Sequence, residues 1–207
     1  MNITRKSLRA CYRDLAERAS IDLDFLLLTV VAAVICTFGF RMNSASVIIG
    51  AMVISPLLYP VICVGAATFH RERGPFLRAA ATLAAGLLSA IVAAAIVSLF
   101  ATTRMRSEIV DRVSMQAVDY LFVALFSGVA GTYAFFSPKV HEAIAGIAIS
   151  VALVPPVAML GIGIANRDAG LVYASVTIVL CNVCGIYIGS IAMVAGLHWI
   201  TRDRDAI

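Results

Sequence analysis

The chain has 207 residues, of which 61% are hydrophobic and 14% are charged, and its formal net charge is +4. A soluble domain holds roughly 45–50% apolar and about 25% charged residues, because it must cover its core with a polar surface. The composition therefore excludes a soluble enzyme and indicates that much of the chain faces lipid.

Six stretches of the chain lack Asp, Glu, Lys and Arg, and each is close to or above the ~18–20 residues that cross a bilayer. Only helices and closed barrels satisfy their own backbone hydrogen bonds inside lipid, and the alternation of a barrel strand is absent. The sequence therefore predicts an all-α membrane protein with about six transmembrane helices. The stretches are residues 25–40, 42–69, 79–103, 121–138, 143–166 and 169–200.

The first segment, residues 1–20, is basic and lacks the short apolar core and small-residue cleavage site of a secretory signal. Apolar side chains recur in it at helical spacing, at Leu8, Tyr12, Leu15 and Ala19. This pattern predicts a cytoplasmic amphipathic helix that lies on the anionic inner leaflet. The alternative is a solvated basic lead-in to the first span.

Lys and Arg are unevenly distributed between the two sides of the predicted spans. One side holds eleven of them and the other holds five, so we expect both termini on the cytoplasmic side of a prokaryotic inner membrane. The net charge fits this topology and contact with lipid, and no nucleic-acid patch accompanies it. The richer side holds Arg5, Lys6, Arg9, Arg13, Arg18, Arg71, Arg73, Arg78, Lys139, Arg202 and Arg204, and the other holds Arg41, Arg104, Arg106, Arg112 and Arg167.

The chain resembles itself when it is shifted by 96 residues without a gap. Each copy would hold three spans, and an odd number of crossings inverts the second copy, as in many secondary transporters. The alternative is chance similarity between apolar segments. The aligned pairs include Gly50 with Gly146, Pro60 with Pro156, Gly65 with Gly161, Arg71 with Arg167 and Gly74 with Gly170. The predicted organisation is an N-terminal helix at 1–20, repeats at 21–102 and 117–200, a polar connector at 103–116 and a tail at 201–207.

Prolines fall near the middle of the second and fifth predicted spans. Because proline lacks a backbone N–H and clashes with the carbonyl four residues earlier, the carbonyls of Met52, Val151 and Ala152 should lose their helical partners. Non-helical backbone at membrane depth persists only inside protein or beside a wet cavity. We therefore expect helices 2 and 5 to be broken at a central pathway. The alternative is that the prolines only kink two packed helices.

A few polar side chains lie near these prolines and in the sixth span. A serine can bond its own helix backbone, whereas Asn182 in hydrocarbon needs a partner, either as a link between helices or as part of a pathway lining. The predicted substrate or ion pathway consists of Ser55, Pro56, Tyr59, Pro60, Ser150, Pro155, Pro156 and Asn182.

Small residues mark faces where helices should approach closely. In the sixth span they form the G-x-x-x-G motif of Gly185 and Gly189. The pattern leaves open whether the partner helix belongs to the same chain, and we expect a homo-oligomer. The predicted packing glycines are Gly50, Gly65, Gly86, Gly146, Gly161, Gly185 and Gly189.

No arrangement of side chains points to catalysis or to a bound metal. The C-x-x-C of Cys181 and Cys184 lies inside an apolar helix, and His70, His141 and His198 lie at span ends without ligand spacing. A nucleophile–base pair and a phosphate loop are also absent. We therefore expect a protein that is not an enzyme and that needs no cofactor and no metal.

Two stretches carry a resemblance to a known family. They are residues 18–65, which contain the string G-A-M-x-x-x-P-L-x-x-P from Gly50 to Pro60, and the segment AGIAISVALVPPVAMLGIGIA. Together they resemble the "domain of unknown function 389" family of prokaryotic membrane proteins over about residues 18–200. The resemblance implies a multi-spanning membrane protein and supplies no substrate.

The inverted repeat and the paired prolines favour a secondary transporter of a small solute or ion, with lipids as its other partners. An ion channel fits the same features, and a structural or membrane-assembly protein is the third class. No Asp, Glu, Lys or Arg lies in the middle of a span, which disfavours a proton relay.

Overall fold

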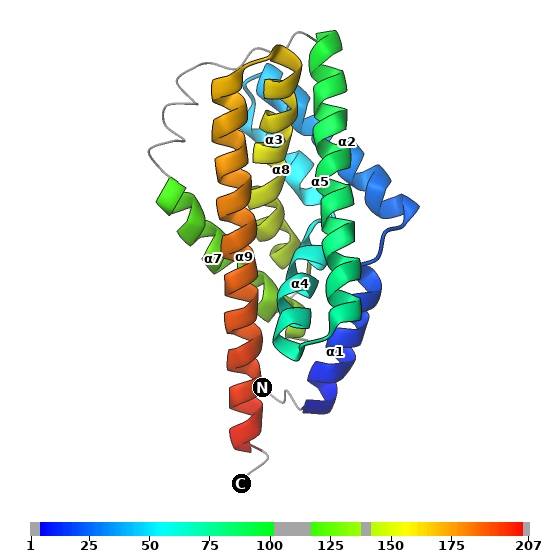
Figure 1. Cartoon of the computed structure of the whole chain (residues 1–207), viewed down its shortest axis with the longest axis vertical. Helices are drawn as coiled ribbons and strands as arrows, with labels where there is room; N and C mark the ends of the chain where they lie inside the picture. The colour runs from blue at the N-terminus through cyan, green and yellow to red at the C-terminus, as the bar shows by residue number, and fades with distance from the viewer. Residues whose placement is uncertain (1–4, 102–116, 138–141, 205–207) are drawn as a thin grey trace.

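The computed structural model describes residues 5–101, 117–137 and 142–204, and every regular element in these ranges is an α-helix. α5, α8 and α9 run along the long axis of the molecule, while α2 and α7 cross it obliquely (Figure 1). α8 packs against both α5 and α9. The helices are α1 (Arg5–Arg18), α2 (Leu23–Arg41), α3 (Ala45–Ile54), α4 (Leu58–His70), α5 (Arg73–Ala101), α7 (Ala117–Phe136), α8 (Glu142–Asn166) and α9 (Ala169–Arg204).

Several of these helices can cross a membrane by length and composition. α2, α5, α7 and α9 each contain an apolar stretch that is long enough, and α3 with α4 forms a fifth candidate span that is bent by 56°. Within α8, the part with described side chains, Ala152–Asn166, is apolar but shorter. The prediction of an all-α membrane protein is confirmed, with four to five candidate spans in the described part of the chain.

Two corners of the bundle are built alike, although they lie at opposite ends of the molecule (Figure 1). α4 and α8 each end at an arginine in the left-handed backbone conformation, Arg71 with φ 58° and Arg167 with φ 56°. This conformation directs the next N–H groups back to the last carbonyls of the helix. The closing bonds run from Glu72 to Ala67 at 3.0 Å and from Asp168 to Gly163 at 2.9 Å.

The N-terminal helix α1 forms as predicted, but its apolar face does not rest on lipid. Leu8, Tyr12, Leu15 and Ala19 are all buried, and they belong to the main hydrophobic core. α1 packs against α4, α7 and α9 at the end of the molecule where α9 also ends (Figure 1). Protein therefore covers the stripe that the sequence predicts to insert into the bilayer, and the position of α1 relative to the membrane stays a prediction.

The glycines of α9 bring it against α7 of the same chain. A Cβ added at Gly185 would lie 2.7 Å from the Leu121 carbonyl oxygen, and one at Gly189 would lie even closer to that of Leu125. From the other side, a Cβ added at Gly128 would clash with the Ile186 carbonyl oxygen. No side chain fits at these positions, so within the described chain α9 packs on α7 at the two glycines where the sequence predicts a close helix contact.

The other predicted packing glycines divide into two groups. Gly65, Gly86 and Gly161 each have a neighbour within 3 Å of an added Cβ, on another element. Gly50 has none within 4 Å and is exposed, so it makes no close helix contact within the described chain, and its packing role stays a prediction. The surroundings of Gly146 lie outside the described residues.

Candidate functional site at the helix break

The second predicted span is broken where Pro56 lies. α3 ends at Ile54 and α4 begins at Leu58. Because Pro56 has no N–H, it cannot donate to the carbonyl of Met52. Ser55 takes an extended conformation, with φ −71° and ψ 128°, which is the region that a following proline imposes. The prediction of a broken helix is confirmed at this position.

Pro60 does not contribute to the break, although it lies only four positions further along. It is the third residue of α4, in the first turn of that helix. N–H groups in a first turn have no helical acceptor, so a proline there removes nothing. Of the two prolines in this span, Pro56 is the one that interrupts the helix.

The fifth predicted span is not broken, which corrects the prediction for Pro155 and Pro156. α8 continues as one helix from Glu142 to Asn166, with both prolines inside it. A pair of interior prolines normally ends or kinks a helix, because the carbonyls before them lose their donors. A replacement donor is therefore needed.

Asn182 of α9 supplies a replacement donor for one of these carbonyls. Its side-chain Nδ2 donates a hydrogen bond to the carbonyl oxygen of Ala152, in a buried environment. Ala152 is the residue whose carbonyl Pro156 cannot serve. The sequence predicts that Asn182 needs a partner and that the Ala152 carbonyl loses its helical donor. One hydrogen bond satisfies both groups. This contact between α8 and α9 was not predicted, because sequence spacing gives no distance between helices.

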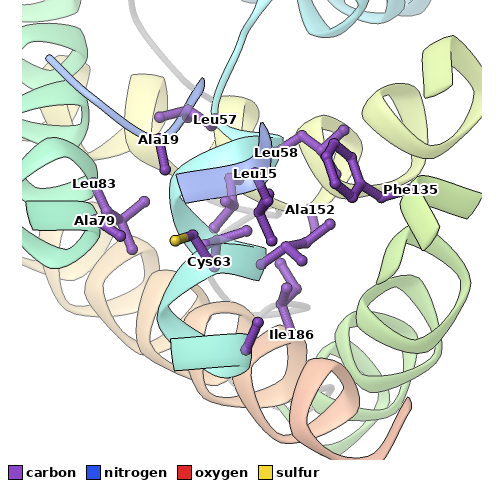
Figure 2. Packing of buried hydrophobic residues seen from close by; sticks show 14 of the residues in the cluster. Leu15, Ala19, Leu57, Leu58, Cys63, Ala79, Leu83, Phe135, Ala152 and Ile186 are labelled. Carbon is purple, nitrogen blue, oxygen red and sulfur yellow. The ribbon is translucent and has the colours of Figure 1, made fainter. Parts of the chain in front are cut away.

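Buried apolar side chains fill the space around the break. Figure 2 shows Leu58 beside Phe135, with Ala152 and Ile186 close by, so that α4, α7, α8 and α9 meet there. Leu57, at the start of α4, and Leu153 of α8 are fully buried in the same cluster. The two proline-bearing segments therefore lie in one core, as predicted, and apolar side chains close the contact between them.

The polar residues predicted for the pathway have different surroundings. Ser55 is buried at the break. Tyr59 is half-buried, and its ring meets that of Phe135 edge to face at a centroid distance of 6.1 Å. The side chain of Ser150 lies outside the described residues.

The N-terminal helix reaches the break from one end of the molecule. The guanidinium carbon of Arg18, at the end of α1, lies 5.6 Å above the ring centre of Tyr59, within cation–π range. Beside α1 is a polar crevice of about 570 Å³, lined by residues that include Arg13, Glu17 and Arg78. The sequence pattern did not reveal this contact, because it predicted that α1 faces lipid.

Aromatic and histidine side chains connect α1 to the ends of α4 and α9. The rings of Tyr12 and His70 have centroids 4.6 Å apart, and those of His70 and His198 are 5.1 Å apart. The hydroxyl of Tyr12 donates to Glu72 at 3.2 Å. Burial, and next the Glu72 carboxylate, raises the pKa of Tyr12 above its usual value, so the hydroxyl stays protonated and can donate.

No group of three or more potential metal ligands occurs in the described part of the chain. The two cysteines of the C-x-x-C motif, Cys181 and Cys184, form no disulfide with each other. The chemistry that the centre offers is therefore that of backbone carbonyls, an amide and hydroxyls.

Comparison with known proteins places the chain in a family. The family model described as "Domain of unknown function (DUF389)" matches residues 52–188, more than half of the chain. The chain belongs to the DUF389 family. An uncharacterized protein of Methanocaldococcus jannaschii is 22% identical over 183 residues, which cover 88% of this chain and 57% of the relative. The chain thus spans little more than half of that relative's length. No solved structure matches.

The DUF389 match contains the whole candidate site. It begins at Met52, whose carbonyl precedes the break, and it extends beyond Asn182. α1 lies before the matched residues, so the contact of Arg18 with Tyr59 joins the DUF389 region to a segment outside it.

Proposed function

We propose that this DUF389 protein is a secondary transporter of a small solute or ion, with its pathway between the α3–α4 break and α8. The observation that carries the proposal is the meeting of an interrupted helix with a proline-bearing helix in one buried core. Interrupted helices at membrane depth are typical of transporter binding sites, because their free carbonyls and helix ends can replace the hydration of a ligand.

The similar helix corners support two inverted three-helix repeats, as the sequence predicted. Arg71 and Arg167 are 96 positions apart, and each bond that closes the first corner has a counterpart shifted by the same number. The equivalent corners lie at opposite ends of the bundle (Figure 1), which is the relation that inversion requires. The paired bonds are Arg71 to Thr68 with Arg167 to Ile164, Glu72 to Ala67 with Asp168 to Gly163, and Phe76 to Glu72 with Val172 to Asp168.

The crossings between the proposed repeats support the same relation. Gly65 of α4 crosses α9, and Gly161 of α8 crosses α5. A Cβ at Gly65 would meet Ser190 Cβ, the Tyr187 oxygen and the Ile191 nitrogen, and one at Gly161 would meet Ala94 Cβ, the Ile91 oxygen and the Ala95 nitrogen. The three neighbours of Gly161 are those of Gly65 moved back by 96 positions, and Gly161 itself is Gly65 moved forward by 96. The middle helix of each repeat thus packs on the last helix of the other.

In this proposal the repeats comprise α2 to α5 and α7 to α9, with α8 as the counterpart of α3 and α4, and both termini are cytoplasmic. Leu57, Leu58 and Leu153 close the pathway in the described conformation. A ligand would meet carbonyls, the Asn182 amide and the hydroxyls of Ser55 and Tyr59, because no Asp, Glu, Lys or Arg lies within residues 42–69 or 143–166. The site therefore suits a small ligand whose polar groups are satisfied by uncharged partners.

Flux measurements with the purified protein in liposomes test the proposal. We expect saturable uptake and counterflow for at least one member of a panel of ions and small polar solutes, and loss of this flux in Pro56→Ala. Pro75→Ala is the matched control, because Pro75 lies in the first turn of α5, away from the break. Unitary currents would identify a channel instead. Absence of any flux across the panel, in protein that stays folded, would favour the structural or assembly class.

A further inference from the structure

The centres of the two proposed repeats differ at positions that the shift of 96 residues makes equivalent. Pro60 corresponds to Pro156. Pro156 lies inside α8 and leaves the carbonyl of Ala152 without a backbone donor, whereas Pro60 lies in the first turn of α4 and removes no helical hydrogen bond. The equivalent of Asn182 in the first repeat is Gly86. The second repeat thus has an amide that caps the carbonyl exposed by its proline, and the first repeat has a glycine at the equivalent position.

The space that an asparagine would need in the first repeat is already occupied. A Cβ added at Gly86 would lie 2.8 Å from Cζ of Phe25 and 2.9 Å from Cδ2 of Leu57. Leu57 belongs to the break itself and is fully buried. In the second repeat its equivalent is Leu153, which is buried inside continuous helix, and Asn182 bonds to the residue before it. Both leucines are therefore buried, and the repeats differ in the amide cap and in the continuity of the helix.

We propose that the hydrogen bond from Asn182 keeps α8 a continuous helix. We also propose that the protein has a second conformation in which α8 is interrupted and α3–α4 is continuous. In that conformation α8 opens over residues 150–154, the equivalents of 54–58, and α3 and α4 join into one helix. This inference rests on the proposed inverted repeats. It assigns Asn182 as the positioning residue that determines which repeat contains the interrupted helix. The ligand class remains the one proposed above.

The packing of the two repeats is compatible with this second conformation. The contacts at Gly65 and at Gly161 are equivalent, so neither crossing favours one conformation over the other. The two segments share one hydrophobic core, so a change in one changes the space available to the other. Close-packed cores of this kind adopt discrete alternative packings more readily than intermediate ones. The Asn182 bond and Pro56 then remain as the local features that distinguish the halves.

Amide hydrogen exchange of the protein in lipid nanodiscs tests this role of the Asn182 hydrogen bond, with Asn182→Ala as the first variant. Loss of a buried hydrogen bond shifts a local opening equilibrium by about tenfold. We expect peptides over 150–160 to exchange about tenfold faster and peptides over 52–59 to exchange more slowly. The second change is the decisive one, because a residue that only stabilises α8 would not protect a segment in the other repeat.

Pro56→Ala provides a second route to the same state. This substitution would restore a backbone donor to the carbonyl of Met52, so residues 52–59 should become protected and residues 150–160 should exchange faster. Ser190→Ala is the matched control on α9, because Ser190 is buried and its hydroxyl has no hydrogen-bond partner in the described residues. It should change neither segment.

The proposal is overturned if Asn182→Ala accelerates exchange in α8 without protecting 52–59, or if it changes neither segment. Misfolding of Asn182→Ala leaves Pro56→Ala to decide, by the same two peptides. Hydrogen exchange measures the protection of backbone amides and needs no transported ligand. Evidence against the second conformation is therefore distinguishable from a lack of the proposed flux in liposomes.

Discussion

α3–α4 and α8 pair similar sequences with different conformations, and the difference shows that a proline alone does not determine whether a membrane helix breaks. Both segments hold two prolines, yet one is interrupted at Pro56 and the other is continuous through Pro155 and Pro156. In α8 the amide of Asn182 replaces the donor that Pro156 removes, whereas the break in α3–α4 lies at Pro56, whose equivalent in α8 is Ala152 and not a proline. The position of the proline in the helix and the donor that a partner helix supplies both bear on the outcome.

The largest expected effect tests the crossings that hold both segments in place. Gly161→Ala should destabilise the protein by about 3 kcal/mol, because the added Cβ would lie 2.5 Å from the backbone oxygen of Ile91, which cannot move aside. Thermal unfolding in detergent measures the change. Gly50→Ala is the control, because nothing lies within 4 Å of an added Cβ. An equal loss in both variants would contradict the assigned crossing.

The next effect concerns the capped carbonyl in α8. Asn182→Leu leaves the carbonyl of Ala152 buried without a partner, and we expect a loss of roughly 2 kcal/mol of stability. Pro156→Ala restores a backbone donor to the same carbonyl, so the cost of Asn182→Leu should fall by about half in that background. Additive effects of the two substitutions, measured in a double-mutant cycle, would show that they do not act on one carbonyl.

A smaller effect compares the two aligned prolines directly. Pro60→Ala should change stability by less than about 0.5 kcal/mol, because Pro60 lies in the first turn of α4 and displaces no hydrogen bond. Pro156→Ala should alter it more, because Pro156 is inside α8. Equal responses in thermal unfolding would mean that the helical context of the two prolines does not matter.

The smallest effect concerns the contact of α1 with the break. Arg18→Gln removes the cation above the Tyr59 ring together with the exposed ion pair to Asp14, and we expect a total loss of about 0.5 kcal/mol, since the guanidinium also has exposed surface. Arg13→Gln, on the same helix and exposed, serves as the control. A change in stability that is the same for both would indicate a general charge effect rather than this contact.

The sequence predicted the parts of this fold that depend on one helix at a time. Apolar runs located the helices, Pro56 marked a break, and Gly185 with Gly189 marked a close crossing. The predictions failed where a second helix decides the result. The continuity of α8 depends on Asn182, and the burial of Leu8 and Leu15 depends on α4 and α9. Local spacing carries no information about which distant helix supplies a donor or covers an apolar face.

The burial of α1 has a consequence for how the protein is made. Leu8, Tyr12 and Leu15 pack in a core to which α4 and α9, both later in the chain, contribute. At synthesis, α1 leaves the ribosome before either of these helices exists, so its apolar stripe must wait on the bilayer surface, where amphipathic helices bind. Docking of α1 is therefore complete only after α9 has been made, and a chain truncated before the end of α9 would lose part of the cover over this stripe.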